Sequence, residues 1–468
     1  MNLHLWLLLG YAAGIVLLGL WIGRRVRTSG DFFVAGRRLG PGLLFSTMVA
    51  ANIGAGSTVG AAGLGYRDGL SAWWWVGSAA IGSVVLAFTV GPRIRREAER
   101  HGLHTVGDYL EHRYGRAVRG IVAALLWVGT LAILAGQLVA LAWVLEVVAG
   151  IPKVFGCIVG GLVMTTYFTA GGLLTSAWVN LVQLVVMVAG FALALPLAMA
   201  HAGGWDAVQA ATPGGPFWSP WKGGASGWNY LALLGPAFVI SPGLLQKIYG
   251  ARDDRAVRKG VAANALVLLA FAFVPPLLGI VARAQHPGLA NHELALPTIL
   301  MYDLPPLLGS LGLAAVVSAE VSSADAILFM LSTSLSRDLY RRFVDPGASD
   351  ARVLAVARWA AVVGGTLGVL LAIVSPTVIG ALSIFYTLLG VCLFVPVVAG
   401  LYVRRVGTPE ALAAIAAGVS LMLATHVGTD GRGFGALSPA LVGLAAAGLA
   451  CALVAIGRRA YDRAPEAP

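Results

Sequence analysis

The stretch FSTMVAANIGAGSTVGAAGLGY, at residues 45–66, decides the fold, because it is apolar enough to enter a membrane yet is not a simple membrane anchor. Gly54, Gly56 and Gly60 interrupt it, and small polar residues stand beside them. Glycine weakens a helix, and small polar side chains can satisfy the backbone groups that an unwound turn releases. The stretch therefore predicts a transmembrane helix that is broken partway across the membrane.

A second apolar stretch, YLALLGPAFVISPGLLQKIYG at residues 230–250, carries similar helix breakers, in its Gly-Pro and Ser-Pro-Gly runs. In the predicted order of spans the two stretches are five spans apart, so they cross the membrane in opposite directions. Two broken helices at matching positions of inverted halves are typical of the central site of a transporter. For either stretch alone, close helix packing through small residues such as Gly56 and Gly60 is the alternative.

The composition of the whole chain indicates the same environment. Of 468 residues, 58% are hydrophobic and 11% are charged, which is too little charge to cover a soluble domain. The apolar blocks are long enough to cross a hydrocarbon core of about 30 Å as helices. We predict an all-α polytopic membrane protein with about thirteen transmembrane helices. The predicted spans are 4–22, 42–66, 69–91, 117–148, 151–170, 175–200, 227–249, 257–283, 305–336, 352–374, 377–403, 409–427 and 436–457.

Basic residues are distributed unevenly between the two sides of these spans. If the N-terminus is outside, the cytoplasmic segments hold 27 of the 32 Lys and Arg residues, five of them in residues 24–38. This excess matches the positive-inside rule. The net charge of +11 therefore indicates topology and not a nucleic acid partner. We expect a multi-pass protein of the cell (cytoplasmic) membrane, with its N-terminus outside and its C-terminus in the cytoplasm.

The densest polar group within a predicted span lies in the ninth, LGLAAVVSAEVSSADAILFMLSTSLSRDLY. Ala319, Ser322 and Ser323 follow the spacing i, i+3, i+4 and share one helical face. Hydroxyl and carbonyl oxygens are hard ligands that suit an alkali cation, and the carboxylate of Asp325 borders this face. Glu320 lies about 100° around the helix and needs a different partner. Ionisable groups within spans are costly, so these residues are functional candidates.

Several of these motifs resemble a known family, the sodium:solute symporters. Residues 319–325 and 336–340 look like the sodium-binding helix of that family, and residues 50–53 resemble the matching helix of its sodium/sugar members. The resemblance covers nearly the whole chain. It includes the predicted turn at 169–172 and the run at 246–252 that follows the broken seventh span.

The resemblance implies a LeuT-like fold in a single transmembrane domain. A leading helix would cover residues 4–22, two inverted repeats of five helices would cover about 42–200 and 227–403, and two trailing helices about 409–457. It also implies a co-transported sodium ion. The implied sodium ligands are the backbone carbonyls of Ala50, Ile53 and Ala319 and the hydroxyls of Ser322 and Ser323.

One position departs from the pattern of the family. Many relatives carry an aspartate in the sixth span near the sodium exit path, where this chain has Asn180. Our hypothesis is that Asp325 supplies the missing negative charge, for ion release or for a second cation. The alternative is that Asp325 pairs with a cytoplasmic arginine.

We expect the solute to bind at the two breaks and on the helices beside them. The candidates are Asn52, Ser57, Thr58, Trp74, Gln137, Ser241, Gln246, Ser383, Tyr386 and Thr387. Sugar-type relatives carry a Glu-Gln pair where this chain has Gly56-Ser57, which argues against a sugar. The tryptophans at 73–75 could face a cationic ligand through cation–π attraction or lie at the lipid interface. A small carboxylate at the N-termini of the broken helices is also allowed.

These features predict a secondary active transporter for sodium-coupled uptake of a small organic solute by alternating access. It would act in the lipid bilayer and require no protein partner. The alternative is a proton-coupled symporter that relies on Asp325 and Glu320. We expect no enzyme, because the eight histidines are scattered through loops and span ends and the chain has no HExxH, CxxC or GxSxG motif.

Overall fold

The structure, a computed structural model, describes residues 3–23, 39–224 and 227–461. In these ranges the chain forms helices joined by loops, and ten helical stretches are long and apolar enough to cross a membrane. The prediction of an all-α polytopic protein is thereby confirmed. The number thirteen stays a prediction, because these stretches do not match the predicted spans one to one; Gly56–His101, for example, includes parts of two of them. The basic segment 24–38 lies outside the described residues.

The helices follow one another along the chain with short connections. They are α1 (Leu3–Gly23), α3 (Pro41–Asn52), α4 (Ala61–Asp68), α5 (Trp73–Val85), α6 (Gly91–His101), α7 (Val106–Tyr114), α8 (Arg116–Ala149), α9 (Lys153–His201), α10 (Trp205–Ala211), α11 (Gly227–Ile240), α12 (Pro242–Tyr249), α13 (Asp254–Phe271), α14 (Val274–Gln285), α15 (Ala295–Tyr302), α16 (Pro306–Thr333), α17 (Asp350–Val374), α18 (Val378–Leu389), α19 (Val395–Tyr402), α20 (Thr408–Gly428) and α21 (Pro439–Tyr461). Wider π-helical turns are η2 (Gly56–Gly60), η4 (Leu86–Val90), η7 (Ser334–Val344) and η8 (Gly390–Phe394).

The second span is broken where the sequence predicts it. Its first half, α3, ends at Asn52, and Ile53 then adopts an extended conformation with φ −96° and ψ 104°. The helix resumes as η2 at Gly56 and continues as α4. Gly54 permits a close approach here, since a Cβ atom at this position would lie 2.3 Å from Ser323 Oγ. The break therefore brings the backbone of the second span against α16.

The seventh span is broken at one of the two predicted places. Ser241 is non-helical, with φ −52° and ψ 121°, and Pro242 opens α12 at a position where its missing N–H costs nothing. Pro236, by contrast, lies inside α11, which continues through it. The predicted break at Gly235-Pro236 is therefore wrong. The close approach here depends on Gly82 of α5, where a Cβ atom would lie 2.5 Å from the Gly235 carbonyl oxygen, whereas a Cβ atom at Gly235 would meet only Leu231 at 3.6 Å.

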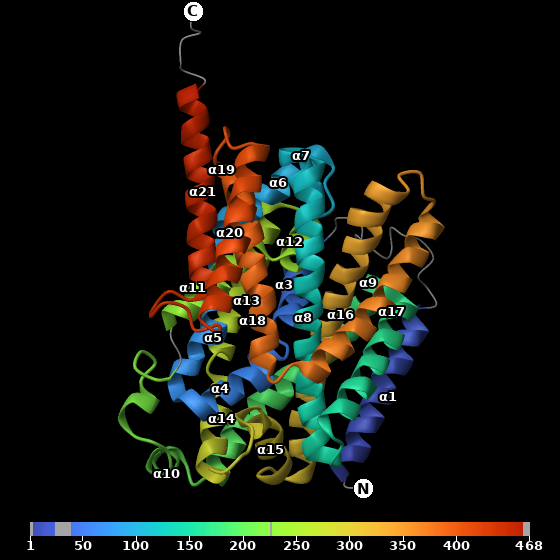
Figure 1. Cartoon of the computed structure of the whole chain (residues 1–468). Coiled ribbons are helices and arrows are strands. Elements are labelled where there is room, and N and C mark those ends of the chain that lie inside the picture. Colours follow the sequence, from blue (N-terminus) through green and yellow to red (C-terminus); the bar gives the residue numbers. More distant parts are fainter. Residues whose placement is uncertain (1–2, 24–38, 225–226, 462–468) are drawn as a thin grey trace, which may run out of the picture.

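Two groups of helices surround the breaks. In the first, α3 packs on α13, α4 on α14, and α5 on α11. In the second, α8, α9, α16 and α17 pack on one another, with α1 against α9 and α16 and α18 against α8. Figure 1 shows α10 and α15 at one end of the bundle and α6 and α7 at the other, with α20 and α21 side by side at the edge.

One predicted boundary is wrong. The sequence predicts a turn at 169–172, but the backbone of α9 is helical from Lys153 to His201. Each glycine in a helix costs only about 1 kcal/mol relative to alanine, which packing can outweigh. This helix packs on α1, α8, α16 and α17. The side chains of residues 169–178 lie outside the described part of the structure.

Candidate functional site

Two serines of α16 contact the break in the second span. Ser323 Oγ lies 3.0 Å from the carbonyl oxygen of Ile53. Ser322 Oγ lies 3.1 Å from the carbonyl oxygens of both Ala50 and Ala319. All five residues are buried. The structure thus brings together, in one buried cluster, the oxygen-bearing groups that the resemblance implies as sodium ligands.

The break explains why these carbonyls are free of helical hydrogen bonds. In a continuous helix the N–H of Gly54 would bond the carbonyl of Ala50, and the N–H of Ser57 that of Ile53. Here the N–H of Gly54 donates to Ser57 Oγ at 2.9 Å, and the N–H of Ser57 donates to the carbonyl of Gly54 at 2.9 Å. Two carbonyl oxygens are released, and oxygens of this kind suit a hard cation.

Two amide side chains fix the break from opposite sides. Gln137 of α8 accepts a hydrogen bond from the N–H of Ala55 through its Oε1 atom at 2.9 Å. Asn52, at the end of α3, donates from Nδ2 to Oδ1 of Asn264 on α13 at 3.1 Å. The first contact reaches into one helix group and the second into the other. The break is therefore positioned by both groups.

The partner of Glu320 is Thr58. The Oγ1 atom of Thr58 lies 2.7 Å from Glu320 Oε1 and 2.9 Å from the carbonyl oxygen of Gly54. Both side chains are fully buried. A hydroxyl has a single proton, so Thr58 can donate to only one of these two oxygens at a time. This contact joins η2, the turn that follows the break, to α16. It also leaves Thr58 unavailable to a solute.

A cavity of about 780 Å³ lies beside the serine cluster, between the two helix groups. Ser323 belongs to both the cluster and the cavity wall. Among the described residues, no Asp, Glu, Lys, Arg or His side chain lines it. Its polar lining residues are Asn52, Ser57, Gln137, Ser241, Ser323 and Tyr386.

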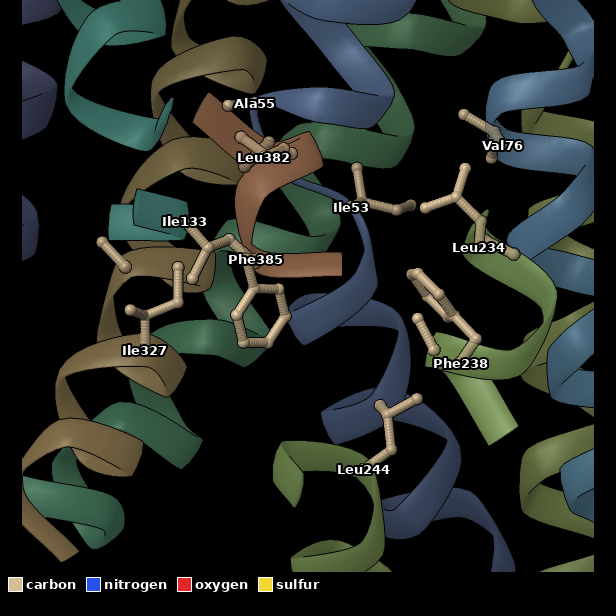
Figure 2. Close-up of a cluster of buried hydrophobic side chains, with 14 of the residues drawn as sticks. Ile53, Ala55, Val76, Ile133, Leu234, Phe238, Leu244, Ile327, Leu382 and Phe385 are labelled. Atoms are coloured by element: carbon tan, nitrogen blue, oxygen red, sulfur yellow. The ribbon is translucent and has the colours of Figure 1, made fainter. Parts of the chain in front are cut away.

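The rest of the wall is apolar and includes several aromatic rings. Figure 2 shows Phe385 and Ile327 on one side of the second span and Phe238 and Leu234 on the other, with Leu244 lower in the view. Phe385 and Ile327 come from α18 and α16, Phe238 and Leu234 from α11, and Leu244 from α12. The cavity is therefore bounded by elements of both helix groups and by both breaks.

Half of the predicted solute-binding residues do not line this cavity. They are Thr58, Trp74, Gln246, Ser383 and Thr387. Trp74 packs its ring on Trp221, with centroids 4.6 Å apart, and Trp75 lines the cavity instead. Ser383 donates within its own helix to the carbonyl of Ile379 at 2.7 Å. The sequence does not show which of the two tryptophans faces the cavity, because the inward face of α5 is set by the packing of the helices around it.

Further cavities follow toward α7. A second one, of about 580 Å³, shares Met330 with the first and is also lined by Gln246, Arg119 and Asp338. A third, of about 1110 Å³ and more open, shares Thr105 and Arg119 with the second. Adjacent cavities thus share residues of their walls. Sequence reasoning missed Met330, because nothing in its local pattern distinguishes it from a core residue.

An ionic network borders the second and third cavities. Arg119 Nη2 lies 2.6 Å from Asp338 and 3.0 Å from Asp108, and its Nη1 lies 2.8 Å from Glu111. Glu111 also pairs with Arg342. Burial opposes ionisation of Glu111, but the hydrogen bonds from the two arginines outweigh it and lower its pKa. The network joins α7, α8 and η7 at the end of α16.

The two candidates for the ion path lie on neighbouring helices. Asp325 is 1% exposed and lies on α16, three residues beyond Ser322. Asn180 is half-buried on α9, which packs along α16.

The sequence profile of the sodium:solute symporter family matches residues 32–418. The chain belongs to this family. It is 25% identical over 404 residues to the sodium/glucose cotransporter of Vibrio parahaemolyticus, covering 77% of this chain and 73% of that protein. It is 25% identical over 439 residues to the high affinity choline transporter 1 of Homo sapiens, covering 87% and 74%.

The fold is that of solved transporters. A Na⁺-coupled sialic acid symporter superposes with a TM-score of 0.79 at 18% identity, covering 97% of this chain and 98% of the other. The LeuT-like fold predicted for this symporter is thereby confirmed. The chain is a multi-pass membrane protein and a secondary active transporter that couples the uptake of a small solute to sodium.

Proposed function

We propose that the co-transported sodium ion binds between α3 and α16. Its ligands are the carbonyls of Ala50, Ile53 and Ala319 and the hydroxyls of Ser322 and Ser323. The observation that carries the proposal is the contact of both serines with carbonyls released by the break. When the ion binds, the two serine hydroxyls turn their lone pairs toward it and their protons away. The ion is then surrounded by five oxygen ligands in one buried cluster.

The solute occupies the central cavity and the ion helps to form its site. Ser323 lies in the wall of the cavity, so an ion held by its hydroxyl also fixes one side of the solute site. Because the ion bridges the two helix groups, it favours the arrangement in which they are close at the break. A ligand shifts such an equilibrium only by its difference in affinity between the two states, and this bridge provides that difference.

Release then proceeds toward α7. Movement of Met330 would join the central cavity to the second one, and opening of the Arg119–Asp338 pair would widen the way to the third. Asp325, in place of the aspartate that this chain lacks at Asn180, would assist departure of the ion. The inverted repeats at about 42–200 and 227–403 account for the matching contacts of α3 and α4 with α13 and α14 and of α5 with α11.

The protein would lie in the cytoplasmic membrane with its N-terminus outside. Figure 1 shows α6, which holds four arginines and two glutamates, at the end toward which α21 runs, in agreement with a cytoplasmic C-terminus. We also propose that the chain has no catalytic activity, binds no nucleic acid and needs no protein partner. The similar proteins named above are transporters, which supports the first point.

A proton-coupled symporter is the second candidate, and Glu320 is the observation that favours it. Its carboxyl group is fully buried and its single hydrogen bond among the described residues comes from Thr58. Such a group is costly inside a membrane protein unless it has a role. The serine cluster favours sodium, because it offers five neutral oxygens and no site for a proton.

Uptake into proteoliposomes distinguishes the two candidates. A panel of labelled carboxylates, amino acids, sugars and quaternary amines is offered with an inward sodium gradient, with an inward proton gradient, or with neither. Potassium replaces sodium in the controls. We expect at least one solute to accumulate only with the sodium gradient. Accumulation that follows the proton gradient and ignores sodium would overturn the sodium proposal in favour of proton coupling.

A further inference from the structure

The hydrogen-bonding groups of the central cavity are largely engaged by the protein itself. Ser57 Oγ accepts from the N–H of Gly54, Gln137 Oε1 accepts from Ala55, and Asn52 Nδ2 donates to Asn264. The groups left for a solute are few, mainly the second amide atoms and the hydroxyls of Ser241 and Tyr386. A polyhydroxylated solute would leave many of its own polar groups without partners, which is costly in a buried site.

The cavity also lacks a cationic side chain for an anionic solute. No Lys, Arg or His lines it among the described residues. Phosphates and sulfates are usually held by such side chains, often in bidentate geometry. The wall instead offers neutral dipoles and hydrocarbon. This lining favours a solute whose charge, if it has one, is positive and spread over apolar groups.

Four aromatic rings grouped around Tyr386 form an aromatic wall of the cavity. The ring centroid of Tyr386 lies 5.3 Å from that of Phe385, 5.6 Å from Phe238 and 6.1 Å from Trp75. All four residues line the cavity. Tyr230 packs on Trp75 in an edge-to-face arrangement, with centroids 5.2 Å apart. Three helices, α5, α11 and α18, therefore contribute to this aromatic wall.

We infer that the solute is a small quaternary ammonium compound whose cationic head packs on this aromatic wall. A quaternary nitrogen has no N–H group, so it needs no hydrogen-bond acceptor, and its methyl groups match the apolar lining. Indole and phenol rings attract such a cation through their negative faces. A hydroxyl or carboxylate arm of the solute would reach the remaining polar groups near the breaks. The inference rests on the proposed function, in which the central cavity binds the solute.

Two carboxyl groups lie behind the lining of the cavity. That of Glu320 lies 2.7 Å from Thr58 Oγ1, and Thr58 directly follows Ser57 in the cavity wall. The buried Asp325 on the same helix adds a second acid in this region. The site thus carries acidic groups behind its lining, although none faces the solute directly.

The deciding experiment compares choline with its neutral isostere 3,3-dimethylbutan-1-ol, in which carbon replaces the quaternary nitrogen. Labelled choline is taken up by proteoliposomes under an inward sodium gradient, with potassium as the replacement cation. We expect sodium-dependent uptake of choline, and inhibition by glycine betaine or unlabelled choline at concentrations at least tenfold lower than those of the isostere. Equal inhibition by choline and the isostere would show that positive charge is not recognised and would overturn the inference.

Two variants locate the effect. Trp75→Leu removes the indole from the wall, and we expect the KM for choline to rise about tenfold while the half-saturating sodium concentration stays nearly unchanged. Trp74→Leu, one residue away but outside the cavity, serves as the matched control. An equal KM in wild type and Trp75→Leu would also overturn the inference. Sodium-driven uptake of glucose or pantothenate but not of choline would reject a quaternary ammonium solute and leave the proposed function intact. Solute uptake that does not depend on sodium for any solute would reject the proposed function.

Discussion

The hydroxyl oxygen of Ser323 lies 3.0 Å from the carbonyl oxygen of Ile53, a residue 270 positions earlier in the chain. This contact joins α16, in one helix group, to the break of the second span, in the other. The same serine lines the central cavity. In the proposed function, this single side chain links the ion, the solute and the two groups of helices that alternating access must move.

Removal of the serine hydroxyls should weaken sodium coupling. Ser322→Ala and Ser323→Ala each remove one proposed ligand, and we expect each to raise the half-saturating sodium concentration for uptake about tenfold, which corresponds to about 1.4 kcal/mol. Ser332→Ala is the matched control, because Ser332 is buried on the same helix but donates only to the carbonyl of Leu328. If all three variants depend on sodium as the wild type does, the serines are not ligands.

A methyl group at Gly54 should disrupt the same cluster. A Cβ atom there would lie 2.3 Å from Ser323 Oγ and 2.9 Å from Gln137 Oε1, so one of these side chains must move. We expect Gly54→Ala to reduce sodium-driven uptake at least tenfold. Gly14→Ala on α1 is the control, since a Cβ atom at Gly14 meets nothing within 4 Å. Normal sodium dependence in Gly54→Ala would contradict the described geometry of the break.

The Thr58–Glu320 pair should behave as a unit in stability measurements. Thr58→Val removes the hydroxyl that lies against the buried carboxyl and should cost about 1–3 kcal/mol of folding free energy. Adding Glu320→Leu removes the carboxyl as well, so the double variant should regain part of that loss. Unfolding of the purified protein in detergent measures each corner of the cycle. Strictly additive losses would show that the two side chains do not interact.

The ionic network near α7 makes stability depend on acid pH. The pKa of Glu111 is lower in the folded protein than its ordinary value of 4.5, because the hydrogen bonds from Arg342 and Arg119 outweigh burial. Its contribution is therefore fully present above about pH 5 and is lost as the pH falls through the folded-state pKa. We expect wild type to be more stable than Glu111→Gln at pH 7 and the difference to shrink below pH 4.5. A difference that is constant from pH 7 to pH 3 would contradict the assigned pairing.

The breaks and the serine cluster could be predicted from the sequence because their residue types have few other uses. Gly54 beside small polar residues, and Ser241 before Pro242, indicate unwound backbone, and the structure has it at both places. The spacing of Ser322 and Ser323 fixes their shared face on a helix. The prediction of a break at Gly235-Pro236 was wrong, because a proline within a helix is tolerated when neighbouring helices pack closely around it.

The remaining cavity residues depend on tertiary packing that no local pattern records. Trp74 and Trp75 differ by about 100° around α5, and only the position of α11 and α18 decides which of them faces the cavity. Thr58 looks like a solute ligand until Glu320, 262 positions later, is placed against it. Met330, which lines two cavities, has no polar feature to mark it.

Direct binding of ²²Na⁺ to the purified protein tests the central claim without knowledge of the solute. We predict saturable binding to wild type and to Ser332→Ala, measured in potassium-containing buffer, and loss of that binding in the Ser322→Ala/Ser323→Ala double variant. Saturable binding of equal affinity in the double variant would contradict the proposal that sodium is held between Ile53 and the two serines of α16.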